Sequence, residues 1–189
     1  MNNRLTTSLR YAILLTTLSA WAPGFAQTPS SAQDAINVCA PHSVAQRHPD
    51  VAAICQHGRD WIIAFKAGDI DRLMQLYRPD ARVALHGQRM LVGVAAIRAF
   101  FAPALAARPD VTFLLHVEDI RVVGDIAYLV SRYWYTSRLS DGKSLQDAGR
   151  SVLVYRRDHH KGSDARWKIQ IDIDQATPDV SFPAPASAQ

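Results

Sequence analysis

The chain has 189 residues, of which 48% are hydrophobic and 20% are charged, and its formal net charge is +4. This length fits one globular domain. The basic residues are scattered among acidic ones and form no stripe along the chain, which excludes a nucleic-acid-binding surface of the usual kind.

The first residues have the order of a secretory signal peptide. Arg4 and Arg10 precede an uncharged, largely apolar run over residues 11–22, and the small residues Gly24 and Ala26 follow it. We expect cleavage after Ala26, which leaves 163 of the 189 residues and a net charge of about +2. A membrane anchor or a core helix is the alternative, but the run is shorter than the roughly 20 apolar residues of a spanning helix. The protein is therefore expected to be periplasmic or secreted, with no stable membrane insertion after cleavage.

The only cysteines are Cys39 and Cys55. In an oxidising compartment such a pair can form a stable disulfide, and a loop of this length is worth about 3 kcal/mol in the loop-entropy model. The bridge would tie an N-terminal extension, residues 27–50, to the first main helix. Two free thiols or a nucleophilic cysteine are the alternatives, and the spacing is not that of a zinc site.

The first half of the mature chain is helical in pattern. Apolar residues recur at helical spacing from Val51 until Gly68, and a second apolar stripe runs from Ile70 to Tyr77 before Pro79. Short strands are expected over residues 82–86 and 90–92, and a third helix over residues 94–107.

The second half changes to the pattern of long strands. These are expected over residues 111–123, 126–139, 146–157 and 167–175, with a hairpin signal at Gly124-Asp125. Residues 179–189 are rich in Ala, Pro and Ser and are expected to form a flexible tail. Helices followed by an antiparallel meander indicate an α+β domain over residues 51–178. Because such a sheet must cover its apolar face, we expect it to curve around three N-terminal helices as a cone.

Several motifs resemble those of SnoaL-like, ketosteroid-isomerase-like domains of the nuclear-transport-factor-2-like superfamily. They are WIIAFKAGDID (61–71), LYRPDARV (76–83), GVAAIRAF (93–100), DAGR followed by VLVYRR (147–157), and WKI (167–169). Each has a plain physical interpretation as a helix cap, turn or strand residue. In this order they are specific for the fold and much less so for function.

Ketosteroid isomerases use an aspartate base beside a tyrosine and a protonated aspartate that stabilise an oxyanion. The resemblance places Trp61 at the tyrosine position, Leu85 at the base and Ser151 near the protonated acid. Leu85 cannot take a proton, so classical steroid isomerisation is not expected unless His86 replaces it as the base.

The resemblance implies an apolar pocket inside the cone. Its expected catalytic residues are His86 as a base and Arg132 as an oxyanion partner, and its expected ligand-binding residues are Trp61, Tyr77, Trp134, Ser151, Tyr155 and Gln175. Alternatively, Arg132 forms a structural ion pair with an acid such as Asp147 or points outward. His86 can be an ordinary surface residue, and Trp61 and Tyr77 can be core residues. On the last strand, Asp172 and Asp174 alternate with isoleucines and are expected to face away from the pocket.

These observations favour an exported domain that binds a small apolar or aromatic molecule. One alternative is a cofactor-independent isomerase, cyclase or lyase that acts next to a carbonyl, and another is a structural or assembly module with a closed pocket. The resemblance implies a homodimer formed through the outer face of the sheet. No metal or other cofactor is expected.

Overall fold

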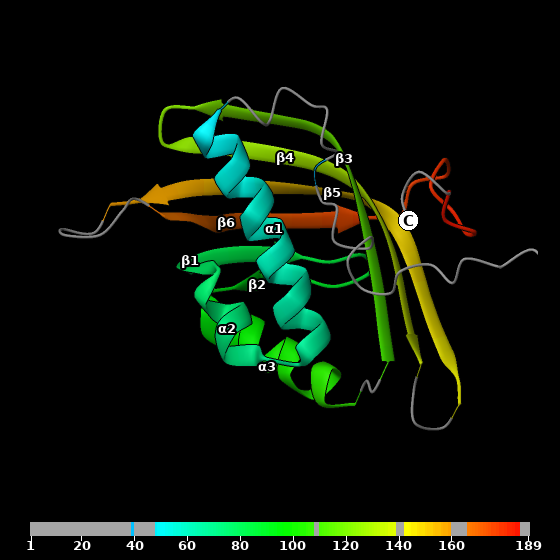
Figure 1. The fold of residues 1–189 in the computed structure, drawn as a ribbon. Helices are drawn as coiled ribbons and strands as arrows, with labels where there is room; N and C mark the ends of the chain where they lie inside the picture. The colour runs from blue at the N-terminus through cyan, green and yellow to red at the C-terminus, as the bar shows by residue number, and fades with distance from the viewer. Residues whose placement is uncertain (1–38, 40–47, 108–109, 139–141, 160–165, 186–189) are drawn as a thin grey trace, which may run out of the picture.

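The computed structural model describes residues 39, 48–107, 110–138, 142–159 and 166–185. The predicted signal peptide and most of the predicted extension lie outside these residues. Helices and a curved sheet form the domain (Figure 1). Its elements are α1 (Pro49–Ala67), α2 (Ile70–Gln75), β1 (Tyr77–Ala84), β2 (Leu91–Val92), α3 (Val94–Ala106), β3 (Asp110–Val123), β4 (Ile126–Arg138), β5 (Ser144–Asp158) and β6 (Arg166–Gln175).

The corner between the first two helices lies where the sequence predicts. Gly68 closes α1 in the left-handed conformation at φ 69°, which glycine adopts without steric penalty, and its backbone N–H reaches carbonyls of the last turn. The next residue, Asp69, caps α2 because its side chain accepts a hydrogen bond from the backbone N–H of Arg72 at 2.9 Å. The two helices are therefore joined by a sharp corner.

The sheet has six strands in the order β2-β1-β6-β5-β4-β3. The long strands β3 to β6 pair antiparallel, as predicted, but β1 pairs with β6 in parallel, so the sheet is mixed. The α+β fold is confirmed, and the expectation of a wholly antiparallel sheet is wrong. The last strand, β6, runs parallel to β1 on one side and antiparallel to β5 on the other. It thereby joins the short strands of the first half of the chain to the long strands of the second half.

The second predicted helix is shorter than its apolar stripe. It ends at Gln75, and Tyr77 already belongs to β1, where it pairs with Ile169 of β6. The β1–β6 register is irregular between Tyr77 and Arg82, and such a stretch accommodates Pro79, which has no N–H to donate. The strand thus begins five residues before the predicted position.

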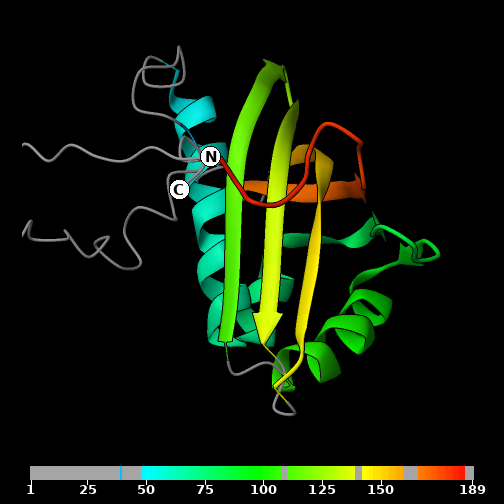
Figure 2. The same ribbon diagram turned by 90° about the vertical axis from the view of Figure 1, so that its right-hand side faces the viewer.

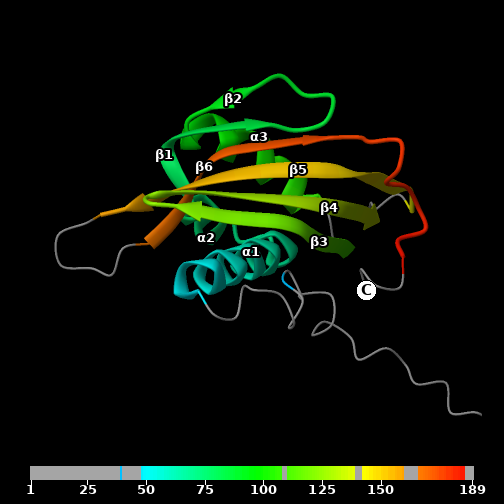
Figure 3. The ribbon, with the colours of Figure 1, turned by 90° about the horizontal axis from the view of Figure 1, so that it is seen from above.

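The main core lies between the helices and the concave face of the sheet. Seen from above, α1 lies against one side of the curved sheet, with the short β1–β2 pair at its far edge (Figure 3). The core residues include Ile54, Phe65, Leu73, Ile97 and Leu129, all buried. No helix in the described part of the chain is long and apolar enough to cross a membrane.

A smaller core lies on the opposite, outer face. Leu114, Trp134 and Val180 are buried there, and the indole N–H of Trp134 donates to the carbonyl of Ser181 at 2.9 Å. The C-terminal segment crosses the outer face of the long strands (Figure 2). Residues 179–185, expected as part of a flexible tail, therefore pack on the sheet because an apolar patch and a carbonyl partner are available to them.

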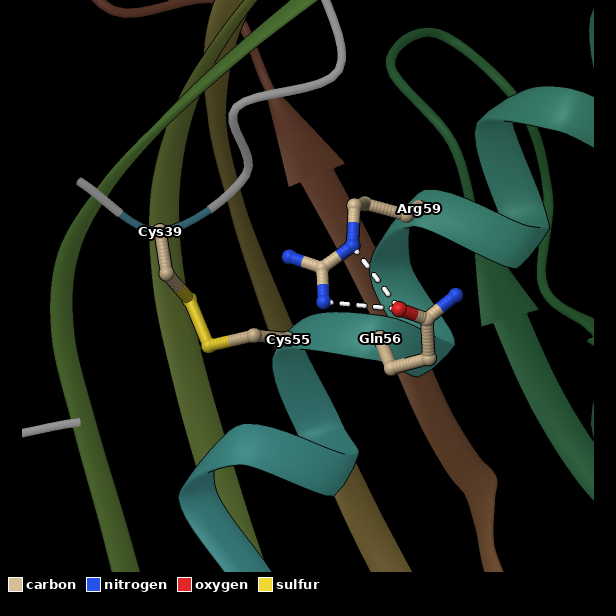
Figure 4. The surroundings of a disulfide bond; sticks show 4 residues. All are labelled: Cys39, Cys55, Gln56 and Arg59. Atoms are coloured by element: carbon tan, nitrogen blue, oxygen red, sulfur yellow. Dashed lines mark hydrogen bonds between the residues drawn. A yellow bond between two sulfur atoms is a disulfide. The ribbon is translucent and has the colours of Figure 1, made fainter. Parts of the chain in front are cut away.

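The structure contains the predicted disulfide. Cys39 and Cys55 are joined with their Cα atoms 5.9 Å apart, and Figure 4 shows Cys55 on α1 beside the pair formed by Gln56 and Arg59. The bridge fixes Cys39 to the first main helix, as expected. A disulfide and the membrane finding above are compatible with an exported protein.

Candidate functional site

A cavity of about 450 Å³ lies between the helices and the concave face of the sheet. One group of lining residues is apolar or aromatic and includes Trp61, Phe65, Leu85, Phe100, Phe101, Phe113, Leu115, Tyr133, Tyr135, Leu153 and Ile169. The other group is polar and includes His86, Gln88, Gln146, Asp147, Ser151, Asp172 and Asp174. A mostly apolar cavity of this size with a few convergent polar groups is the usual composition of a small-molecule site.

Aromatic rings form one wall of the cavity. Trp61 and Phe65 are four residues apart on α1, so they share one helix face, and their rings stack with centroids 4.8 Å apart. Phe113 of β3 lies 5.4 Å from Trp61 and stacks with Tyr133 of β4 at 6.3 Å. Aromatic side chains of helix and sheet therefore line the same space and contact one another.

A buried hydrogen-bond chain ends at Asp172. The indole N–H of Trp61 donates to the Tyr77 hydroxyl at 2.8 Å, and that hydroxyl donates to Oδ2 of Asp172 at 2.9 Å. Indole is only a donor and the tyrosine hydroxyl has one proton, so Oδ2 must accept. A proton on this carboxyl therefore sits on Oδ1. Burial raises the pKa of Asp172 to about 7, and the charge of Asp174 adds to the effect.

A β-bulge turns these carboxyls inward. Tyr155 of β5 pairs with Ile169, but the preceding residue, Val154, pairs with Ile171, so Gln170 is an extra residue in β6. An extra residue reverses the alternation of side chains along the strand. Asp172 and Asp174 consequently line the cavity, whereas Ile173 is 41% exposed on the outer face. The expectation that both carboxyls face away from the pocket is wrong.

A second polar cluster centres on His86, just after β1. Its Nδ1 lies 3.1 Å from Oδ1 of Asp147, whose Oδ2 accepts from the Tyr133 hydroxyl at 3.1 Å. The backbone N–H of His86 donates to Asp174. Burial raises the pKa of Asp174 to about 6; the His86 backbone hydrogen bond opposes this shift, and the charge of Asp147 reinforces it.

Four of the predicted site residues line the cavity: Trp61, His86, Ser151 and Tyr155. Ser151 also shares a 2.8 Å hydrogen bond with Ser131. Tyr77 is fully buried behind the wall and reaches the cavity only through its bond to Asp172. The fold thus brings four of the eight expected residues to the cavity, and a fifth, Tyr77, reaches it through Asp172; their roles remain predictions.

The expected inward positions of Arg132, Trp134 and Gln175 are wrong. Tyr133 and Tyr135 line the cavity, so the residues between and beside them point outward. Arg132 pairs on the outer face with Glu118 at 3.1 Å rather than with Asp147, and Trp134 packs against the C-terminal segment. Gln175 is exposed at the end of β6.

The cavity has an acidic character. No lysine or arginine is among its described lining residues, and His86 is the only basic side chain there. In the part of the chain that the structure describes, no group of three or more His, Cys, Asp or Glu side chains is arranged to hold a metal ion. The carboxyl, imidazole and hydroxyl groups of the lining can transfer protons and form hydrogen bonds.

The fold matches solved structures over most of their lengths. A conserved protein from Planctomyces limnophilus is 20% identical, with 71% of this chain and 98% of that chain covered and a TM-score of 0.62. A ketosteroid isomerase-like protein from Erwinia carotovora atroseptica is 15% identical (68% and 96% covered, TM-score 0.57). A nuclear transport factor 2-like superfamily protein from Salmonella enterica is 18% identical (70% and 90% covered, TM-score 0.54).

The sequence comparison assigns the family. No curated protein matches the chain. The family model described as a SnoaL-like domain matches residues 37–162, well over half of the sequence. This match covers four of the five motifs, the helices and the strands β1 to β5, and it ends before the WKI motif and β6. The chain therefore belongs to the SnoaL-like domain family.

Proposed function

We propose that this protein binds a small, largely apolar or aromatic molecule in the cavity between its helices and its sheet. The observation that carries the proposal is the cavity itself, whose volume of about 450 Å³ falls within the range typical of ligand sites. Its lining combines apolar and polar groups. Phe100 and Phe101 of α3 line it together with the rings of α1 and β3, whereas His86 and Asp174 supply polar groups. A bound molecule would be oriented by this difference.

Two single substitutions on β5 test this binding site. Leu153 lines the cavity, and its neighbour Val152 is 41% exposed on the opposite face of the same strand. We expect saturable binding of 2-naphthol, followed by its fluorescence, to disappear in Leu153→Trp and to persist in Val152→Trp. Thermal unfolding checks that both variants fold. Equal binding to both folded variants would place the site elsewhere, and no saturable binding to the native chain would contradict the proposal.

A second candidate function is cofactor-independent acid–base catalysis, as in an isomerase or lyase acting next to a carbonyl. The contact between Asp147 and Nδ1 of His86 favours this function. A carboxylate that accepts the Nδ1 proton leaves Nε2 of the same ring free to act as a base. Asp172, with a pKa raised to about 7 by burial, can donate a proton near neutrality. Arg132 has no part in this arrangement, since it lies on the outer face with Glu118.

Proton exchange on a simple ketone tests the catalytic candidate. We expect the protein to accelerate deuterium incorporation next to the carbonyl of 2-tetralone in D₂O, measured by NMR. His86→Ala and Asp172→Asn should each lower the rate about 100-fold, the usual size of an acid–base contribution, and Arg132→Ala should leave it unchanged. Exchange no faster than in buffer, or equally fast in all three variants, would contradict catalysis by these residues.

We also propose that the protein works outside the cytoplasm, in the periplasm or after secretion. The support is the leader-like order of residues 1–26 and the Cys39–Cys55 disulfide. Mass spectrometry of the protein isolated from its host should show a chain that begins at Gln27 and lacks two hydrogens. A full-length chain with two free thiols would contradict export.

A further inference from the structure

Most of the described carboxylates outside the cavity are paired with cationic side chains; Asp69, which caps α2, and Asp110 are not. Asp71 lies 2.7 Å from Arg98, for example, and Asp179 lies 2.7 Å from Arg150. The other exterior ion pairs involve Asp50, Asp60, Asp80, Glu118, Asp119, Asp125 and Asp158, each with at least one arginine. Pairing with arginine is thus the general condition of acidic side chains on this domain.

The carboxylates inside the cavity differ from this pattern. Among the described residues, neither Asp172 nor Asp174 forms an ion pair with a lysine or arginine, and both line the cavity. Asp172 is 6% exposed, and its Oδ2 is engaged by Tyr77. The described residues give its Oδ1 no hydrogen-bond partner. An isolated buried carboxylate is costly unless a charge or a donor compensates it.

The surrounding titratable groups cannot supply that compensation. Asp172 is faced by Tyr77 from β1, Tyr155 from β5 and Asp174 from its own strand. The one basic lining residue, His86, has its ring against Asp147, which also accepts from Tyr133 of β4. Tyrosines are neutral at physiological pH and the two additional aspartates repel further negative charge. No cationic side chain of the described residues therefore compensates this carboxyl, which leaves two possibilities: a proton on Oδ1, or a positive charge that comes from outside the protein.

The aromatic wall is suited to the same kind of charge. Ring faces carry a partial negative charge and attract ammonium groups within about 6 Å of their centroids. The cavity is lined by Trp61 and Phe65 of α1, Phe113 of β3 and Tyr135 of β4, whose rings contact one another. Carboxylates and aromatic rings in one lining together form an environment for an amphiphilic cation, whereas a ligand carboxylate would meet three aspartates and a single basic side chain, His86.

We infer that the small molecule taken up by this cavity is a lipophilic amine in its ammonium form, with the ammonium group at Asp172 and Asp174 and its apolar skeleton among the rings. This inference rests on the proposed binding function and narrows its ligand class. An ammonium group near Oδ1 of Asp172 would complete the hydrogen bonding of that carboxylate and neutralise part of the charge of the cluster.

Three compounds with the same ring system test the ligand class. Isothermal titration calorimetry at pH 7 would compare 2-(1-naphthyl)ethylamine, 2-(1-naphthyl)ethanol and 1-naphthylacetate. We expect the amine to bind at least tenfold more tightly than the alcohol, and the acetate at least tenfold more weakly than the alcohol. Leu153→Trp should abolish binding of all three. If the alcohol binds as tightly as the amine, the inference is overturned while the proposed function stands; if none binds, both are overturned.

Two further measurements test the inference: the amine affinity of carboxylate variants, and the protons released or taken up when the amine binds. Asp172→Asn should reduce amine affinity at least tenfold and leave alcohol affinity within twofold, whereas the exterior control Asp71→Asn should change neither. Because a cation favours the ionised carboxylates, amine binding near pH 6.5 should release protons, seen as a dependence of the binding enthalpy on the buffer. Proton uptake would instead indicate a neutral acceptor bonded to a protonated carboxyl, and would overturn the inference.

Discussion

Replacing Asp172 by asparagine is expected to stabilise the protein at neutral pH. The two side chains have the same shape, and an asparagine oxygen can accept the hydrogen bond from Tyr77 that Oδ2 accepts at 2.9 Å. The variant therefore keeps the buried chain from Trp61 but removes the ionisable group. Any pH dependence of the stability difference between the two proteins must then come from Asp172.

The size of the effect follows from the pKa of Asp172. Burial raises it from 3.8 to about 7, so between these values the unfolded chain loses this proton while the folded chain keeps it. Stability falls with rising pH wherever the folded state binds more protons. The difference in pKa corresponds to about 4 kcal/mol. Below pH 4 the carboxyl is mostly protonated in both the folded and the unfolded state, so it costs little stability. Above pH 7 it is ionised in both states, and the full loss of about 4 kcal/mol of stability is present.

Urea unfolding of both proteins at several pH values between 4 and 8 measures this difference. We expect Asp172→Asn and the native chain to be about equally stable at pH 4, and the variant to be more stable by up to about 4 kcal/mol at pH 8. The exposed Asp71, at 78% side-chain exposure, provides the control. Asp71→Asn should change stability by no more than about 0.5 kcal/mol. A stability difference for Asp172→Asn that is the same at pH 4 and pH 8 would refute the reasoning.

Three other substitutions test other parts of the structure. A Cβ at Gly149 would lie 1.9 Å from the backbone oxygen of Gln175, so Gly149→Ala should lower the free energy of unfolding by about 3 kcal/mol; an unchanged urea midpoint would contradict this packing. Cys39→Ser removes a disulfide of sequence separation 16 and should lower the free energy of unfolding by about 3 kcal/mol. Reducing the disulfide in the native protein should lower it by the same amount. Val152 and Ile173 are paired neighbours on the outer face and each is 41% exposed. If that face forms the proposed homodimer, light scattering should show a dimer for the native chain and a monomer for Val152→Glu; identical masses would contradict it.

Local sequence signals predicted which elements form and in what order, but they placed the end of α2 too late and the start of β1 five residues too late. Gly68 followed by Asp69 marks the end of one helix and the cap of the next, and Gly124-Asp125 marks a hairpin, because each residue satisfies a backbone requirement at its own position. The family motifs then indicated the order of helices and strands. The parallel pairing of β1 with β6 joins residues about 90 positions apart, as Tyr77 and Ile169 are, and no local signal specifies it.

The candidate site was predicted less completely because it depends on which face each strand residue occupies. His86, Ser151 and Tyr155 line the cavity, but Arg132 was placed inside by an error of one residue in a strand whose two faces both carry large side chains. The sequence around the bulge at Gln170 contains no glycine or proline that would predict it. Without it, the alternation from Trp167 to Gln175 predicts isoleucines inside and aspartates outside. The acidic character of the cavity therefore became visible only in the structure.

The most direct test of the central claim is methyl NMR of the folded protein with and without 2-naphthol. Leu85, Leu115 and Leu153 line the cavity, while Val152 and Val154 lie on the outer face of β5. A ring bound inside should shift the methyl signals of the three leucines in a saturable way and leave those of the two valines in place. Shifts confined to the valines, or no saturable shift at any of these methyl groups, would contradict a ligand site in the cavity.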